Sequence, residues 1–196
     1  MNGYEKRKEM KKAAIVKATQ ELVFKNGIAE TSIEAIAKKA QVSKVTIFKH
    51  FTSKENLVLS VFTSYMNNMM DEFEQLVASE MSAKEKISSV LLASDNGAEA
   101  IGSNFFNSII WNDPLIQYEY NKIASERALP AIASIFMQGK AEGIIDEDIT
   151  TEALMAYIGA LMSIFNDPNF LKSSQEYKNS ISKLYFYGIF GKKSDV

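Results

Sequence analysis

The sequence predicts an all-α protein of about nine helices. Its 196 residues include only 9 Gly and 3 Pro, too few turn-forming residues for a fold of many short strands. Apolar residues recur at helical spacing along most of the chain, and no alternating strand pattern interrupts them. With 46% hydrophobic and 23% charged residues, the composition is that of an ordinary globular protein with enough apolar side chains for a core.

The chain opens with a long helix and a short one. Apolar residues recur at helical spacing over residues 11–25, and Asn26-Gly27 supplies a left-handed stop. Thr31-Ser32-Ile33-Glu34 has the pattern of a capping box, in which the Thr31 hydroxyl accepts the Glu34 amide and the Glu34 carboxylate reaches back. It predicts a short helix that ends near Gln41.

A second short helix follows after a tight turn. Ser43 is the predicted N-cap of a helix through Phe51. Thr52-Ser53-Lys54-Glu55 is a further capping box and predicts a long amphipathic helix over residues 53–79. The motif over residues 32–51 is therefore helix, turn, helix, and we expect two domains, residues 1–52 and residues 53–196.

The rest of the chain predicts further helices. Pro114 and Pro168 each follow an Asp, as at helix starts, while Gly143 and Gly191 follow helix ends and Pro130 separates or kinks two helices. The predicted ranges are 83–94, 98–111, 114–126, 128–142, 151–166 and 174–190.

The Cys and His content of the chain excludes several kinds of catalytic and metal site. The chain has no Cys and one His, His50, which excludes disulfides, thiolate nucleophiles and His-based zinc sites. Because no catalytic constellation can be assembled, we expect no enzymatic activity, no metal and no cofactor. No signal-peptide run and no stretch of 18 uninterrupted apolar residues occurs, so we expect a cytoplasmic protein without a membrane partner.

The net charge of −2 conceals an asymmetry. Residues 1–57 carry 12 Lys and Arg against 6 Asp and Glu, whereas residues 58–196 carry 10 against 18. A basic end on an acidic body favours a polyanionic partner that one part of the chain binds. The run of Lys6, Arg7, Lys8, Lys11 and Lys12 is either a basic arm that follows DNA or a solvated terminus.

The predicted helix-turn-helix carries hydrogen-bond donors that suit a polyanionic partner such as DNA. The second helix of this motif is short enough to lie in a DNA major groove while the first braces it. Lys44, Thr46, Lys49 and His50 on the second helix are hydrogen-bond donors. Lys54 and the amides around Thr31-Ser32 are placed to bind phosphates at helix starts.

The run Thr31–Leu57, TSIEAIAKKAQVSKVTIFKHFTSKENL, resembles the DNA-binding signature of the tetracycline-repressor (TetR) family, and the ending LYFYGIFGK over residues 184–192 is similar to many family C-termini. The resemblance is strong over about residues 9–60 and elsewhere concerns architecture. It implies a homodimeric transcription regulator, usually a repressor released from a palindromic operator by a small molecule. Carried onto matching positions, it implies DNA contacts at Ser43, Lys44, Thr46, Phe48, Lys49, His50 and Lys54.

Three positions depart from the family pattern. Gln41 stands where Gly is usual and must accept a left-handed backbone at about 1–2 kcal/mol or alter the turn. Val45 offers methyl groups to thymine where Gly or Pro is common. Phe48 replaces the usual Tyr and lacks the hydroxyl that would reach a phosphate.

The C-terminal region predicts an effector pocket and a dimer interface. Aromatic and Met residues could line an apolar cavity for a small, largely apolar effector, although such residues are more often plain core. The candidate lining residues are Phe105, Ile109, Trp111, Tyr118, Met137, Tyr157, Met162 and Phe165. Helix 151–166 has two apolar stripes, one with Leu154 and Ile158 and one with Ala160 and Ile164, so it must be buried on both sides. The candidate dimer residues are Leu154, Ile158, Leu161, Ile181, Leu184, Tyr185 and Gly188.

Two other readings remain open. The protein could be a constitutive DNA binder with a filled core and no effector. It could also be a helical interaction module whose basic end binds an acidic protein, which the capped helix-turn-helix argues against.

Overall fold

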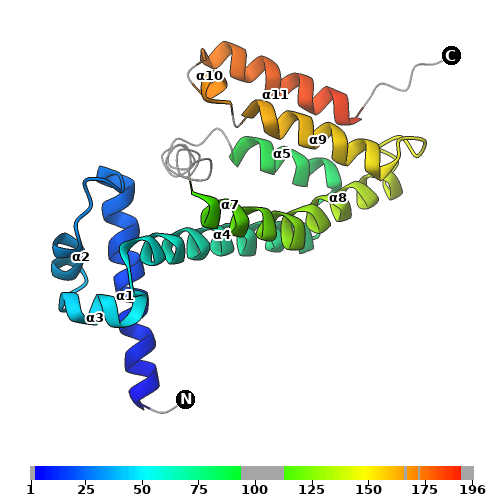
Figure 1. Ribbon diagram of the computed structural model, residues 1–196. Helices are drawn as coiled ribbons and strands as arrows, with labels where there is room; N and C mark the ends of the chain where they lie inside the picture. Colours follow the sequence, from blue (N-terminus) through cyan, green and yellow to red (C-terminus); the bar gives the residue numbers. More distant parts are fainter. Residues whose placement is uncertain (1–2, 94–112, 166, 172, 191–196) are drawn as a thin grey trace. The chain divides into compact units, whose positions relative to one another are not determined.

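The computed structural model describes residues 3–93, 113–165, 167–171 and 173–190, and every regular element in these ranges is a helix (Figure 1). This confirms the all-α prediction. In chain order the elements are α1 (Gly3–Asn26), α2 (Ile33–Lys39), α3 (Lys44–Phe51), α4 (Lys54–Ala78), α5 (Ala83–Ala93), α7 (Pro114–Ile123), a π-helical turn η1 (Ala124–Ala128), α8 (Leu129–Ala141), α9 (Thr151–Phe165), α10 (Pro168–Leu171) and α11 (Gln175–Phe190).

The described residues form two compact units. The N-terminal unit contains residues 3–68 with 113–120, and the C-terminal unit contains residues 69–93 with the described residues from 121 onward. The division falls inside α4 rather than at the expected 52/53 boundary, because Leu57 and Val61 of α4 pack into the core of α1–α3. A capping signal marks where a helix begins, which need not be where packing changes.

The core of the N-terminal unit fixes α3 against α1 and α2. Ile15 of α1, Ile36 of α2 and Ile47 of α3 are fully buried and lie in one cluster with Phe51. The small side chain of Ala37 lies in the same cluster and lets α2 and α3 cross closely. Because Ile47 and Phe51 face inward, the opposite face of α3 is turned to solvent.

The helix starts differ from the prediction by one residue at two of three caps. Ser32, not Thr31, caps α2 and accepts the Ala35 amide at 3.1 Å. Ser53, not Thr52, caps α4 and accepts the Asn56 amide at 3.2 Å. Ser43 caps α3 as predicted, accepting the Thr46 amide at 3.1 Å.

The turn between α2 and α3 contains the expected left-handed residue. Gln41 has φ of +55°, so it adopts the backbone conformation for which Gly is the ordinary choice. Its conformation allows the Val42 amide to donate to the Ala37 carbonyl at 3.0 Å, which closes the end of α2. The packing of α2 and α3 on the same core offsets the free-energy cost of the left-handed backbone at Gln41.

The C-terminal unit has its own apolar core. Ala83 and Ile87 of α5, Ile135 and Phe136 of α8, and Leu154 and Ile158 of α9 belong to one buried cluster. Leu161 is also buried. Leu154, Ile158 and Leu161 are therefore covered within the protomer, and their role as dimer residues stays a prediction.

A polar network ties together the ends of three helices in this unit. The buried Lys86 ammonium of α5 donates to the Val77 carbonyl at the end of α4 and to Gln138 Oε1 of α8, at 2.7 and 2.8 Å. The Glu142 carboxylate accepts the Ala83 amide at 2.9 Å, at the start of α5. These bonds satisfy terminal backbone groups that would otherwise lack partners.

The remaining helix boundaries agree with prediction in most places. The expected helices 114–126 and 128–142 are joined by η1, and Pro130 lies at the start of α8, directly after this π-helical turn. The Asp167-Pro168 pattern correctly marks a helix start at Pro168, but no range was predicted for α10, the short helix that begins there. The predicted helix 98–111 lies outside the described residues.

Candidate nucleic-acid interface

The solvent-facing side of α3 is the candidate interface. Lys44, Val45, Phe48 and Lys49 are exposed on it, with Val45 77% and Phe48 46% accessible. Thr46 is half-buried, and its hydroxyl lies 2.9 Å from Ser43 Oγ. The surface combines two cations with two apolar side chains, which suits both phosphate oxygens and thymine methyl groups.

Lys44 already has a protein partner. Its ammonium pairs with the Glu34 carboxylate of α2, which holds the pKa of Glu34 below its ordinary value. Both side chains are more than half exposed, so the pair adds little stability, and a nucleic-acid ligand would compete for the ammonium.

Of the residues predicted to bind phosphates at helix starts, only some are free to contact a ligand. Ser32 is exposed at the start of α2, but Thr31 is buried, and its hydroxyl donates to the Gly27 carbonyl at 2.7 Å. The Thr31 amide donates to the Ile28 carbonyl at 3.2 Å. Lys54 reaches the same loop, donating to the Ile28 carbonyl at 2.8 Å. Thr31 therefore fixes the α1–α2 loop, and Lys54 is the member of this group that retains further donors.

His50 is half-buried at the end of α3. Burial lowers the pKa of its imidazole most, and the positive charge of Lys8 lowers it further. Glu9 raises this pKa, while Lys12 and Lys49 lower it. The ring is therefore neutral at neutral pH in the free protein. An approaching phosphate would favour its charged form.

The predicted effector pocket is not assembled by the residues that the structure describes. Tyr118 and Met137 are 65% and 60% exposed, and their role in an effector pocket stays a prediction. Tyr157 packs at the edge of the C-terminal core and its hydroxyl donates to the Leu184 carbonyl at 3.2 Å. Phe105, Ile109 and Trp111, and the side chains of Met162 and Phe165, lie outside the described part.

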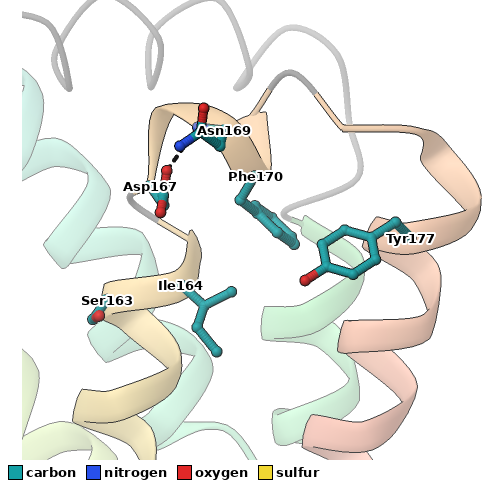
Figure 2. Close-up of a pocket in the computed structure, with 6 residues that line it drawn as sticks. All are labelled: Ser163, Ile164, Asp167, Asn169, Phe170 and Tyr177. Atoms are coloured by element: carbon teal, nitrogen blue, oxygen red, sulfur yellow. Dashed lines mark hydrogen bonds between the residues drawn. The ribbon is translucent and has the colours of Figure 1, made fainter.

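A different hollow lies where α9, α10 and α11 meet (Figure 2). This hollow is open to solvent and has a volume of about 310 Å³, and Ile164, Phe170 and Tyr177 form its apolar part. The rings of Phe170 and Tyr177 are 6.0 Å apart, and Asp167 accepts the Asn169 amide at 2.7 Å beside them. Sequence reasoning missed this hollow because no range was predicted for α10.

The two stripes of α9 are separated by the structure. The Leu154–Ile158–Leu161 stripe is internal, whereas Ala153, Ala160 and Ile164 of the other stripe are exposed. On α11, Leu184 is 64% exposed, Ile181 is half-buried, and the side chain of Tyr185 lies outside the described part. Gly188 faces α9: a Cβ there would lie 2.1 Å from Tyr157 Oη, so glycine permits this crossing.

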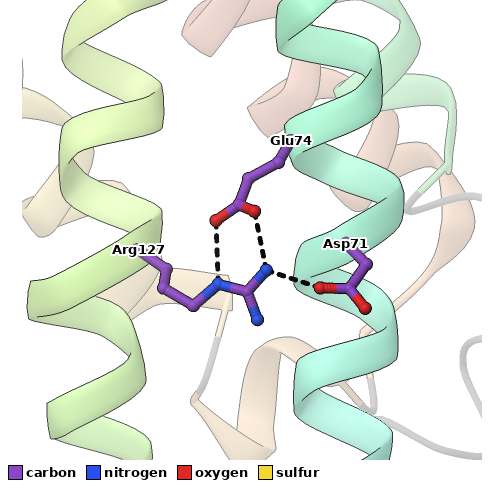
Figure 3. Close-up of polar contacts among 3 residues, drawn as sticks. All are labelled: Asp71, Glu74 and Arg127. Carbon is purple, nitrogen blue, oxygen red and sulfur yellow. Dashed lines mark hydrogen bonds and ion pairs between the residues drawn. The ribbon is translucent and has the colours of Figure 1, made fainter.

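One ion-pair cluster was not predicted from the sequence. Arg127 of η1 binds two carboxylates of α4, those of Asp71 and Glu74 (Figure 3). An Arg near acidic residues far apart in sequence carries no local signal. The Ser82–Glu85 capping box at the start of α5, by contrast, could have been predicted from its pattern: the Ser82 amide donates to Glu85 at 2.9 Å.

The described residues were compared with the requirements of a metal site and of a membrane-spanning helix. No group of three or more His, Cys, Asp or Glu side chains there could hold a metal ion. No helix among these residues is long and apolar enough to cross a bilayer.

A packed helix-turn-helix with a cationic and apolar outer helix defines a DNA-binding protein of the helix-turn-helix class. Residues 15–61 match the family model described as "Bacterial regulatory proteins, tetR family". This match covers the helix-turn-helix, so the DNA-binding domain of the chain is of the TetR-family type.

Relatives agree with this assignment. The chain is 31% identical over 86 residues to the fatty acid metabolism regulator protein of Bacillus subtilis (strain 168), an alignment that covers 44% of each protein. The chain thus spans less than half the length of this relative. A structure described as a TetR-family transcriptional regulator from Mesorhizobium loti MAFF303099 has a TM-score of 0.71, at 22% identity over 95% of this chain and 99% of that one.

A second solved structure resembles the chain in fold. It is the transcriptional regulator FadR of Bacillus subtilis in complex with stearoyl-CoA, with a TM-score of 0.61 at 21% identity, covering 90% of this chain and 98% of that one. These relatives are transcriptional regulators rather than enzymes.

Proposed function

We propose that the protein is a transcriptional repressor that binds a palindromic operator as a homodimer and is released by a small, largely apolar effector. The observation that carries the DNA-binding part is the outer face of α3. There Lys44, Val45, Phe48 and Lys49 are exposed while Ile47 and Phe51 fix the helix to the core. Such a face presents both hydrogen-bond donors and methyl surfaces to base edges. Because the proposed site of action is the chromosome, we also propose a cytoplasmic location.

The dimer part of the proposal rests on α9 and α11. Exposed small residues, Ala153 and Ala160, leave α9 open to close approach, and Leu184 and Tyr177 are large apolar side chains exposed on α11. Two copies of this helix pair would form a four-helix interface with two-fold symmetry. Two reading helices would then lie near one turn of DNA apart, about 34–36 Å.

The effector part of the proposal rests on composition and on relatives. Phe105, Ile109 and Trp111 give residues 101–111 an apolar and aromatic character. The FadR structure contains stearoyl-CoA, which combines a long apolar chain with phosphates. We therefore propose long-chain acyl-CoA thioesters as the first compounds to test.

Selection from random duplex DNA, followed by mobility shifts, tests the DNA-binding part. We expect enrichment of a palindromic sequence that the protein binds as a dimer. Enrichment of asymmetric sites bound by monomers would contradict the dimer, and no enrichment would favour the helical interaction module.

Titration of the selected complex with stearoyl-CoA, free stearate and coenzyme A tests the effector part. We expect release by the thioester at concentrations where coenzyme A has no effect. A complex that resists a broad apolar library, with no thermal shift of the free protein, would identify a constitutive binder.

A further inference from the structure

The first three turns of α1 extend beyond the core of the N-terminal unit. Every residue from Gly3 to Ala14 is exposed, and Ile15 is the first buried residue of the helix. Figure 1 shows these turns continuing past α3 toward the N-terminus. We call residues 3–14 the N-terminal arm. The family match begins at Ile15, directly after the arm, so the arm is additional to the matched domain.

The arm is basic at a position where basic residues oppose helix stability. It carries Lys6, Arg7, Lys8, Lys11 and Lys12 against Glu5 and Glu9, a net charge of +3. Cations in the first turns of a helix are repelled by the helix dipole, and a segment of this length without packing is marginal as a helix. Arg7 donates to the Gly3 carbonyl at 3.0 Å within the arm, yet the arm keeps a net charge of +3 on exposed residues, which suits an anionic surface that covers it.

The arm continues the candidate interface. α1 and α3 pack together in the same unit, and Lys8 and Lys12 are among the charges that act on His50 at the end of α3. Residues four apart lie on one face of a helix, so Lys8 and Lys12 extend the basic surface of Lys49 and His50 outward. At 1.5 Å per residue the arm is about 18 Å long, equivalent to about five base pairs.

We propose that the N-terminal arm binds the DNA backbone outside the half-site read by α3, with Lys8 and Lys12 contacting flanking phosphates. This inference rests on the proposed DNA-binding function. Its occupant is DNA rather than an acidic protein because the basic surface is continuous with the reading helix. The contacts add affinity without sequence preference, since phosphates are the same at every position.

Two duplexes and two proteins test the proposal. One duplex ends at the outer edges of the selected half-sites, and the other carries about eight further base pairs of scrambled sequence on each side. We expect the wild-type protein to bind the longer duplex at least about tenfold more tightly, and the double variant Lys8→Gln/Lys12→Gln to bind both equally. On the longer duplex, the slope of log K against log salt should fall by about 3 to 4, for four lost phosphate contacts per dimer.

A matched variant controls for total charge. Lys25→Gln/Lys84→Gln removes two exposed lysines elsewhere, one of them at the opposite end of α1. It should keep the preference for the longer duplex. Since Gln and Lys have similar helix propensities and the arm is exposed, thermal unfolding of all variants should match the wild type.

The outcomes distinguish a failure of the proposed DNA-binding function from a failure of the arm proposal. Failure of the wild-type protein to bind either duplex would overturn the proposed function itself. Binding that is independent of duplex length, or an equal loss on both duplexes in the arm variant, would overturn the arm proposal alone. Hydroxyl-radical footprinting provides a second measurement: protection beyond the half-sites should be present with wild-type protein and absent with the arm variant.

Discussion

Arg127 binds Glu74 at two points: Nε lies 2.8 Å from Oε1 and Nη2 lies 2.7 Å from Oε2. The same Nη2 lies 2.6 Å from Asp71 Oδ1, so one guanidinium serves two carboxylates one turn apart on α4. This planar, two-point geometry is specific to arginine. It fixes η1 against the C-terminal half of α4.

Replacing Arg127 tests this contact through its pH dependence. Arg127 lowers the pKa of Glu74, so its stabilising effect is complete above the ordinary carboxylate pKa and is lost as the pH falls through the lowered value. Arg127→Gln should therefore melt below the wild type at pH 7, and the difference should shrink as the pH falls below the ordinary carboxylate pKa and through the lowered one. Arg127→Lys should recover only part of the difference, because lysine cannot bind at two points. A difference that is independent of pH would mean that Arg127 acts through packing alone.

Lys44 should read a base, whereas Lys54 should position the protein. Lys44→Ala should relax the preference at one base pair per half-site, at a cost of about 1–3 kcal/mol there. Lys54→Ala should weaken binding to all sequences and lower the salt slope by about 1 for each protomer. Competition mobility shifts with single-base operator variants measure both effects. Identical specificity changes in the two variants would contradict this division.

Releasing Lys44 from its intramolecular partner gives an independent check. Glu34→Gln removes the carboxylate that pairs with Lys44. Operator binding should become tighter, because the Lys44 ammonium no longer has to leave the Glu34 carboxylate in order to bind DNA. The gain should disappear in the Lys44→Ala background. A gain of equal size in both backgrounds would instead reflect the change in net charge.

His50 should make operator binding depend on pH. Its pKa is lowered in the free protein, and a phosphate contact would raise it, so DNA binding should take up protons. Affinity should increase as the pH falls from 8 to 6, by less than about tenfold per pH unit for each histidine. His50→Gln should flatten this profile, as measured by fluorescence anisotropy at constant ionic strength. An unchanged profile would remove His50 from the contacts.

Two carboxylates introduced at different positions should have different effects on assembly. Leu184 is largely exposed, so Leu184→Glu should leave the protomer folded but make it monomeric, with reduced operator affinity. Ile158 is buried in the protomer core, so Ile158→Glu should unfold it, at a cost of several kcal/mol for an unpaired buried charge. Light scattering and circular dichroism distinguish the results. A folded dimer of Leu184→Glu would place the interface elsewhere.

Sequence patterns predicted the helices well and the caps less well. Thr31-Ser32 and Thr52-Ser53 each offer two adjacent capping hydroxyls, and the local pattern does not choose between them. The choice is made by tertiary structure: Thr31 is buried and bonded to Gly27, and Thr52 closes the end of α3 with φ of +61°. For Gln41 the family resemblance left two possibilities, a left-handed backbone or an altered turn, and its φ of +55° shows the first.

The effector region was the least predictable part. Periodicity shows that a helix has apolar faces but not which neighbour covers each face. In α9 the larger residues, Leu154 and Ile158, serve the protomer core, while the stripe with Ala160 is exposed. Tyr118 and Met137 have the composition of pocket residues but face solvent, which only the packing of α7 and α8 decides.

The π-helical turn η1 also constrains how this protein can change in length. A π-turn accommodates one residue more than an α-turn, so the helix after it is rotated by about 100° relative to an uninterrupted α-helix. Losing one residue between Ala124 and Ala128 would restore regular hydrogen bonding, yet it would turn either Arg127 away from α4 or Ile135 and Phe136 out of the core. Descendants of this sequence should therefore vary freely at the exposed Ser125 and Glu126 while keeping the number of residues in the segment unchanged.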